Sequence, residues 1–151
     1  MKLEQVLQEQ GIGYEKHKHK LTYTAQRLAA EEHVSGWDVA KPVVVRSGNT
    51  FTMCVVPAPL RVDVARVAEV LKEPQVRLAT EAEMGELCAD CELGAEPPVG
   101  SLFGIKTIAD ERLREHAYLT VQAGTHTDAL KLRREDWEKL AEPSFSRIAL
   151  E

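Results

Sequence analysis

The sequence has no apolar run long enough to cross a membrane and no large excess of basic residues. A membrane-spanning helix needs about 20 consecutive apolar residues, and no stretch of the 151 residues approaches that length. The formal net charge is −5. This balance argues against a protein that covers long nucleic acids, because neutralising many phosphates requires many Lys and Arg. It still allows one basic pocket for the end of a nucleic acid.

Cysteine is scarce as well. The three cysteines make an odd count, and the N-terminus lacks the pattern of a secretory signal. We therefore expect a cytoplasmic protein with reduced thiols and no membrane partner. Repeats, low-complexity tracts and linkers are also lacking, and this length suits one domain over residues 1–151.

Two familiar kinds of reactive site are incomplete. Cys88 and Cys91 form a lone CxxC pair, but a zinc site would need further ligands at suitable spacing. The pair falls on the apolar stripe of a predicted helix, so we expect it to pack in the core. Neither a G-x-S-x-G motif nor a Ser-His-Asp order is present. The sequence therefore predicts neither a zinc site nor a catalytic triad.

The chain does contain many short elements with clear local signals. Apolar residues at helical spacing predict helices, and β-branched runs between turn residues predict strands. Thr80 and Glu83 match a capping box, and Gly94 suits the residue that ends that helix. Short strands mixed with short helices predict an α+β fold with a mixed, mostly antiparallel sheet. We expect helices near residues 3–10, 22–35, 63–73, 80–94 and 137–142, and strands near 13–19, 43–46, 51–56, 75–78, 106–109, 118–121 and 126–132.

The stretch GAEPPVGSLFGI, residues 94–105, looks least like plain scaffold. It contains three glycines and an adjacent proline pair. Glycine lets a ligand approach the backbone closely, whereas proline fixes φ and removes a donor. Such shaped loops often carry binding sites, with a plain surface turn as the alternative. We call residues 94–105 the central loop.

Three polar side chains are candidates for chemistry. Lys41 precedes Pro42 and a valine run, so it either points into a pocket to hold a phosphate or carboxylate, or extends to water. His126 follows Gly124-Thr125, and a hydrogen-bonded core histidine is favoured there over a catalytic base. The Ser101 hydroxyl is better suited to hydrogen-bond a ligand than to act as a nucleophile.

Together these segments resemble the YbaK/ProX family of free-standing aminoacyl-tRNA deacylases, which is related to the editing domain of bacterial prolyl-tRNA synthetases. The resemblance rests on the central loop, on AKPVVV with its lysine before a strand, on QAGTH at residues 122–126, and on ALKL followed by a helix containing Trp. Order and spacing match from about Leu3 to Pro143. Leu102 replaces a proline that many members carry, and Pro42 replaces a common threonine.

The resemblance implies a compact, barrel-like domain that hydrolyses the ester of mischarged tRNA without a metal ion or cofactor. Lys41 would bind the terminal adenosine or its phosphate. Amides between Gly100 and Gly104 would stabilise the oxyanion, and a positioned water with a ribose hydroxyl would replace a protein nucleophile. The implied partners are the acceptor end of aminoacyl-tRNA and a synthetase. The catalytic candidates are Lys41, Gly100 and Ser101, and the substrate-binding candidates are Leu102, Phe103, Gly104, Gly124 and His126.

A non-catalytic module is the alternative interpretation, and the substituted Leu102 is its motivation. Such a module would bind an amino acid, an aminoacyl nucleotide or a protein partner without hydrolysing it. Loss of the aminoacyl ester from mischarged tRNA distinguishes the two functions.

Overall fold

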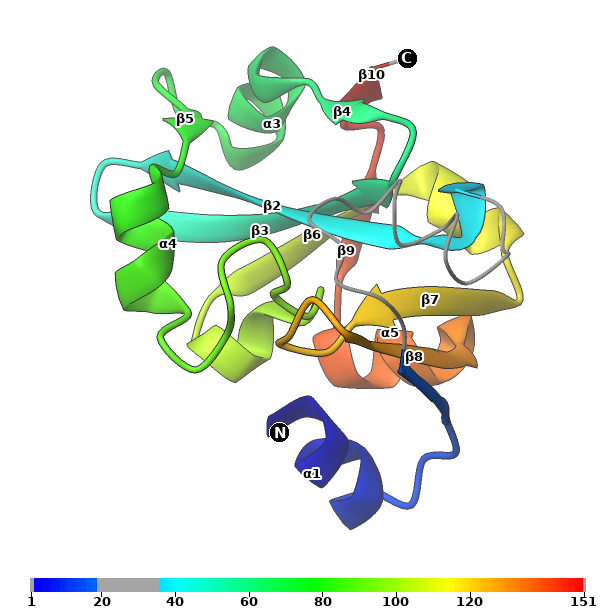
Figure 1. Ribbon diagram of the computed structural model, residues 1–151. Helices are drawn as coiled ribbons and strands as arrows, with labels where there is room; N and C mark the ends of the chain where they lie inside the picture. The colour runs from blue at the N-terminus through cyan, green and yellow to red at the C-terminus, as the bar shows by residue number, and fades with distance from the viewer. Residues whose placement is uncertain (1, 19–35, 151) are drawn as a thin grey trace.

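The computed structural model describes residues 2–18 and 36–150 (Figure 1). The helix predicted over residues 22–35 lies outside these ranges. Within them the helices are α1 (Lys2–Glu9), α3 (Val64–Leu71), α4 (Glu81–Leu87) and α5 (Arg134–Ala141), and the 3-10 segments are η1 (Gly36–Asp38), η2 (Gly100–Phe103) and η3 (Glu111–Glu115). The strands in the same ranges are β1 (Glu15–Lys18), β2 (Ala40–Ser47), β3 (Thr50–Pro57), β4 (Arg61–Val62), β5 (Arg77–Leu78), β6 (Lys106–Asp110), β7 (Tyr118–Gln122), β8 (Asp128–Arg133), β9 (Ser144–Ser146) and β10 (Ala149–Leu150).

A five-stranded sheet in the order β5-β2-β3-β6-β9 forms the centre of the molecule. The predicted β2–β3 hairpin is antiparallel, whereas β3 pairs with β6, and β6 with β9, in parallel. A three-stranded antiparallel sheet, β1-β8-β7, adjoins it through a bridge between Val39 and Thr120. The predicted α+β class with mixed, mostly antiparallel pairing is confirmed. Over the ranges described, the strands form separate sheets and do not close into a barrel.

The two faces of the central sheet contact different apolar clusters. Val44 and Met53 belong to the larger cluster, which also contains residues of the three-stranded sheet and of α5. Val45 and Cys54 face the other way and pack with Val67 of α3. Because side chains alternate along a strand, β2 and β3 supply both clusters, and this explains their nearly continuous apolar sequence. No helix in the described part of the chain is long and apolar enough to cross a membrane.

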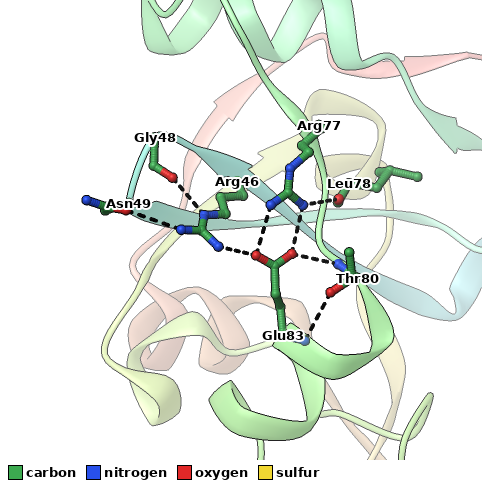
Figure 2. Close-up of polar contacts among 7 residues, drawn as sticks. All are labelled: Arg46, Gly48, Asn49, Arg77, Leu78, Thr80 and Glu83. Carbon is green, nitrogen blue, oxygen red and sulfur yellow. Dashed lines mark hydrogen bonds and ion pairs between the residues drawn. The ribbon is translucent and has the colours of Figure 1, made fainter.

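Glu83 fixes the start of α4 to the β2–β3 hairpin (Figure 2). The predicted capping box is present: Glu83 Oε1 accepts from the Thr80 amide at 2.9 Å, and Thr80 Oγ1 accepts from the Glu83 amide at 3.1 Å. Arg77 donates to both carboxylate oxygens, at 2.7 and 2.9 Å, and Arg46 donates to Oε2. The Arg77 guanidinium, followed by the Thr80 amide and Arg46, holds the pKa of the Glu83 carboxyl well below its usual range.

The end of α4 differs from the sequence prediction. The helix ends at Leu87, with Cys88 as its C-cap, so the prediction that Gly94 ends it is wrong. Gly94 has a φ of 87° but lies in a later turn. The segment after α4 leaves helical geometry because it binds elsewhere: the Glu92 amide donates to Gly124 O at 2.8 Å.

The last predicted sheet strand begins later than its sequence indicates. β8 starts at Asp128, so His126 lies in the preceding turn and not on the strand face. Thr125 Oγ1 donates to Asp128 Oδ2 at 2.6 Å, and this short-range bond competes with extended pairing.

Candidate functional site

The central loop is largely buried and is anchored to α5. Residues 95–100 are buried, which distinguishes this segment from a plain surface turn. Trp137 Nε1 donates to Pro98 O at 2.8 Å, and Ser101 Oγ donates to Leu140 O at 3.2 Å. Trp137 and Leu140 both lie on α5. The loop therefore holds its shape through contacts with α5.

The central loop also contacts the turn between β7 and β8, residues 123–127, which we call the β7–β8 turn. The Gly124 amide donates to Ala95 O at 2.9 Å, while Gly124 O accepts from the Glu92 amide. Gly124 has a φ of 96°, a conformation that glycine adopts without steric cost. These backbone bonds join the start of the central loop to the turn.

His126 strengthens the same junction. Its side chain is buried, and Nε2 lies 2.6 Å from Leu93 O. Because a carbonyl oxygen only accepts, Nε2 carries the proton and donates. The His126 amide also donates to Glu92 Oε1 at 3.2 Å. His126 thus has the buried, hydrogen-bonded setting that its sequence context favours.

Gly100 packs tightly against Ile105 and against Thr107 of β6. A Cβ atom there would be 2.5 Å from Thr107 Oγ1 and 2.7 Å from Ile105 O, distances that leave room for glycine alone. The Gly100 amide donates to Thr107 Oγ1 at 3.0 Å, and Gly100 O accepts from the Ile105 amide at 3.1 Å. The Gly100 amide is therefore already used in a hydrogen bond within the protein.

The tip of the loop is the 3-10 segment η2 and its cap. Leu102 and Phe103 are half-buried and pack against the larger cluster, and Gly104 is exposed with a φ of 72°. The Leu102 amide donates to Val99 O at 3.2 Å, and the Gly104 amide to Ser101 O at 3.3 Å. The Ser101 amide lies in the first turn of η2, where amides have no partner within the helix, so we take it as the candidate donor to a ligand.

Lys41 lies apart from the loop and the turn. Alternation along β2 puts its side chain on the face of Val45, opposite the face of Val44 that contributes to the larger cluster. Lys41 Nζ donates to Ala58 O at 3.2 Å and to Leu60 O. Burial lowers the pKa of this ammonium. An ammonium has three N–H donors, so these two bonds leave one for an anion.

Two buried oxygen atoms flank the β7–β8 turn without a hydrogen-bond partner among the described residues. They are Gln122 Oε1 and Asp128 Oδ1. Buried acceptors in proteins are ordinarily bonded. Each end of the turn therefore carries a buried acceptor whose donor the described residues do not supply.

Sequence reasoning missed the residues that support the site. Glu92, Thr107 and Trp137 each bind a backbone group of the loop or the turn. Their partners lie 34, 7 and 39 positions away along the chain, so no local spacing marks them. The helical spacing around Trp137 indicates only a core residue of the last helix.

Two of the three cysteines are unsuited to reaction as thiolates. None of Cys54, Cys88 and Cys91 forms a disulfide within the described ranges, and burial raises the pKa of the Cys54 and Cys88 thiols to about 12. Thiols with such pKa values stay protonated and react poorly. In the two ranges that the structure describes, no group of three or more His, Cys, Asp or Glu side chains could hold a metal ion.

Comparison with known proteins identifies a family and a fold. A family model described as an aminoacyl-tRNA editing domain matches residues 19–140. A solved structure of a protein described as hypothetical superimposes with a TM-score of 0.89 at 21% identity, covering 99% of this chain and 100% of that chain. No curated protein sequence matches the chain.

Two further solved structures share the fold. A protein proposed to be a trans-editing enzyme for prolyl-tRNA synthetase has a TM-score of 0.84 at 19% identity, covering 99% of this chain and 95% of that chain. A protein from Marinobacter aquaeolei, proposed to act in signal transduction, has a TM-score of 0.77 at 16% identity. This chain covers only 30% of that longer protein.

Proposed function

Because the chain belongs to the aminoacyl-tRNA editing domain family, we propose that it is a deacylase that hydrolyses the aminoacyl ester of mischarged tRNA. The observation that carries the proposal is the family match over residues 19–140. This span contains Lys41, the central loop and the β7–β8 turn. The partner is then the acceptor end of aminoacyl-tRNA, with a synthetase as the source of the mischarged substrate, and the location is the cytoplasm, where translation occurs.

In this proposal Lys41 holds the terminal nucleotide through a phosphate. Its remaining N–H is available for a charge-assisted bond, which is stronger than a neutral one. β5 pairs only with Val45 and Arg46 of β2, so Lys41 lies near an edge of the described sheet. A nucleotide at this edge can contact Lys41 while its aminoacyl group reaches the opposite face, where the central loop packs.

The central loop is proposed to receive the ester carbonyl. The Ser101 amide, at the N-terminal end of η2, is the candidate donor to the developing oxyanion. Gly100 contributes by letting the loop approach β6, and the substrate-binding candidates Leu102, Phe103 and Gly104 shape the surface around Ser101. Water adds to the carbonyl carbon, and the ribose oxygen leaves with a proton, which gives a free amino acid and uncharged tRNA.

The β7–β8 turn is proposed to form the other wall of the site. Gly124 and His126 position this wall through their bonds to residues 92–95. Gln122 Oε1 and Asp128 Oδ1 are acceptors without described partners, and an aminoacyl ester brings donors in its α-ammonium and ribose hydroxyl. The carboxylate of Asp128 would also complement the charge of that ammonium.

The test is incubation of the purified chain with a panel of mischarged tRNAs. The proposal expects at least one aminoacyl ester to be lost faster than in buffer. Calorimetry with the same tRNAs separates the alternative function, since a non-catalytic module would bind and leave every ester intact. That second result would overturn the deacylase.

A further inference from the structure

We propose that the outer face of β7 and β8 is a binding surface for unpaired RNA, separate from the proposed hydrolytic site. The surface consists of Tyr118 on β7 with Lys131 and Arg133 on β8, and we call it the Tyr118 platform. Tyr118 pairs with Arg133, and the buried Thr120 pairs with Lys131. Directly opposed residues share one face of a sheet, so the three platform side chains lie on the same face.

The centre of the platform is an exposed aromatic ring beside a cation. Tyr118 is 50% exposed, although the other residues of its strand are buried. Lys131 Nζ lies 5.2 Å from the centre of the Tyr118 ring. An exposed aromatic face is the group on which unpaired bases stack, and a nearby cation tracks the RNA backbone.

Two grooves adjoin this ring and share Tyr118 and Lys131. One, of about 430 Å³, is also lined by Tyr14, Glu15 and Arg133. The other, of about 340 Å³, extends past Thr120. An extended strand of nucleotides can therefore follow the sheet surface on both sides of Tyr118.

The charges around the platform favour a ligand with few phosphates. Arg133 also forms an ion pair with Asp136, and its Nε lies 3.1 Å from Asp136 Oδ2. Carboxylates also line the grooves, and one of them, Asp38, lies 2.8 Å from His116 Nδ1. Such a mixed surface would repel the dense charge of an RNA duplex more than a short single strand, whose bases contribute stacking.

The position of the platform connects it to the proposed site. Thr120 bridges to Val39, which precedes Lys41 by two positions. The inference rests on the proposed function only for the identity of the RNA, which we take to be the unpaired end of aminoacyl-tRNA. Binding by the platform does not require hydrolysis.

The test measures binding of a fluorescein-labelled single-stranded RNA octamer to the full chain by anisotropy at several salt concentrations. Tyr118→Ala is expected to raise Kd about tenfold, the size of one lost base stack, and Tyr118→Phe to leave Kd unchanged. Lys131→Ala is expected to reduce the slope of log K against log salt by about 0.7, the value for one phosphate of a single strand.

Matched controls are Leu78→Ala, an exposed apolar residue on β5, and Arg66→Ala, an exposed cation on α3. Both are expected to bind as the wild type does. Equal binding by Tyr118→Ala and wild type, absence of RNA binding, or equally tight binding of a duplex octamer would each overturn the platform. Ester loss is scored separately: hydrolysis without platform binding refutes only this inference, and platform binding without hydrolysis refutes only the deacylase.

Discussion

Gly100 shows how a single residue shapes the central loop. The space that a side chain would need is occupied by Thr107 Oγ1 and Ile105 O, and the Gly100 amide is bonded to the same Thr107 hydroxyl. The glycine is therefore required for close packing and not for an unusual backbone angle. This is a role that the sequence could indicate only as a concentration of glycines.

We expect Gly100→Ala to destabilise the fold by about 1–3 kcal/mol, because the added methyl overpacks a closed site. Gly85→Ala is the matched control: Gly85 lies in α4, and a Cβ atom there would meet nothing within 4 Å. That substitution should stabilise by up to about 1 kcal/mol, since alanine favours a helix. Urea unfolding of both variants measures the difference, and equal shifts in the same direction would contradict the packing role.

The sequence predicts a side-chain hydrogen bond reliably when the two bonded residues are close in the chain. The capping box of Thr80 and Glu83 is present as predicted, and Asp63, expected near the start of its helix, is the N-cap of α3. The two carbonyl partners of Lys41 and the bond from His126 to Leu93 join distant segments. No spacing rule reaches such pairs, so the position of Lys41 relative to the loop required the structure.

At the scale of elements, α4 is the helix that precedes the central loop in the chain (Figure 1). Its start is fixed by the bonds of Glu83 to Arg77, Thr80 and Arg46. The sequence extends the helix too far because Met84, Leu87, Cys88 and Cys91 keep helical spacing while long-range backbone bonds take over after Leu87. Helix starts are thus easier to predict than this helix end.

The lowered pKa of Glu83 makes the contribution of this carboxylate to stability testable by changing the pH. Its unfolded-state pKa is about 4.3 and its folded pKa is lower, so the unfolded chain binds the proton more readily. The stabilisation is therefore complete above about pH 4.3 and is lost as pH falls toward the folded pKa. Glu83→Gln should be less stable than wild type at about pH 6. The difference in free energy of unfolding between the two proteins should be smaller at about pH 3.

Urea unfolding at the two pH values measures that gap. Glu86→Gln, at an exposed position of the same helix, is the control and should show little change in stability at either pH. A Glu83→Gln gap of equal size at both pH values would show that ionisation of Glu83 does not contribute.

At the scale of the whole molecule, Asp110 joins the end of the described chain to the central sheet. Asp110 is buried, and its Oδ1 accepts from the Ile148 and Ala149 amides, each at 3.1 Å. Its Oδ2 accepts from the Arg112 amide at 3.1 Å. One carboxylate thus satisfies three backbone donors from two segments.

Asp110→Asn should destabilise the protein by about 1–3 kcal/mol, because the amide nitrogen cannot accept and leaves at least one buried donor unpaired. Thermal or urea unfolding measures this, with the exposed Asp90→Asn as control. An unchanged midpoint for Asp110→Asn would contradict the role of this carboxylate.

The overall architecture is predictable because most elements carry their own periodicity, from the β2–β3 hairpin to the Trp137 helix. The arrangement of the strands as adjoining sheets is not, because it depends on pairings such as β3 with β6 that are remote in sequence. The same applies to the site: the sequence identifies its segments, but only the structure shows which of them touch.

The most direct measurement is the single-turnover rate at which the chain removes the amino acid from a mischarged tRNA that it deacylates. Lys41→Met removes the ammonium and keeps the apolar stem, and Lys72→Met, at the exposed C-cap of α3, is the matched control. A charge-assisted bond contributes about 1.5–3 kcal/mol, so we predict a fall of roughly 10- to 100-fold for Lys41→Met and none for Lys72→Met. Ester loss at the buffer rate with the wild-type chain, across the whole panel of tRNAs, would contradict the account.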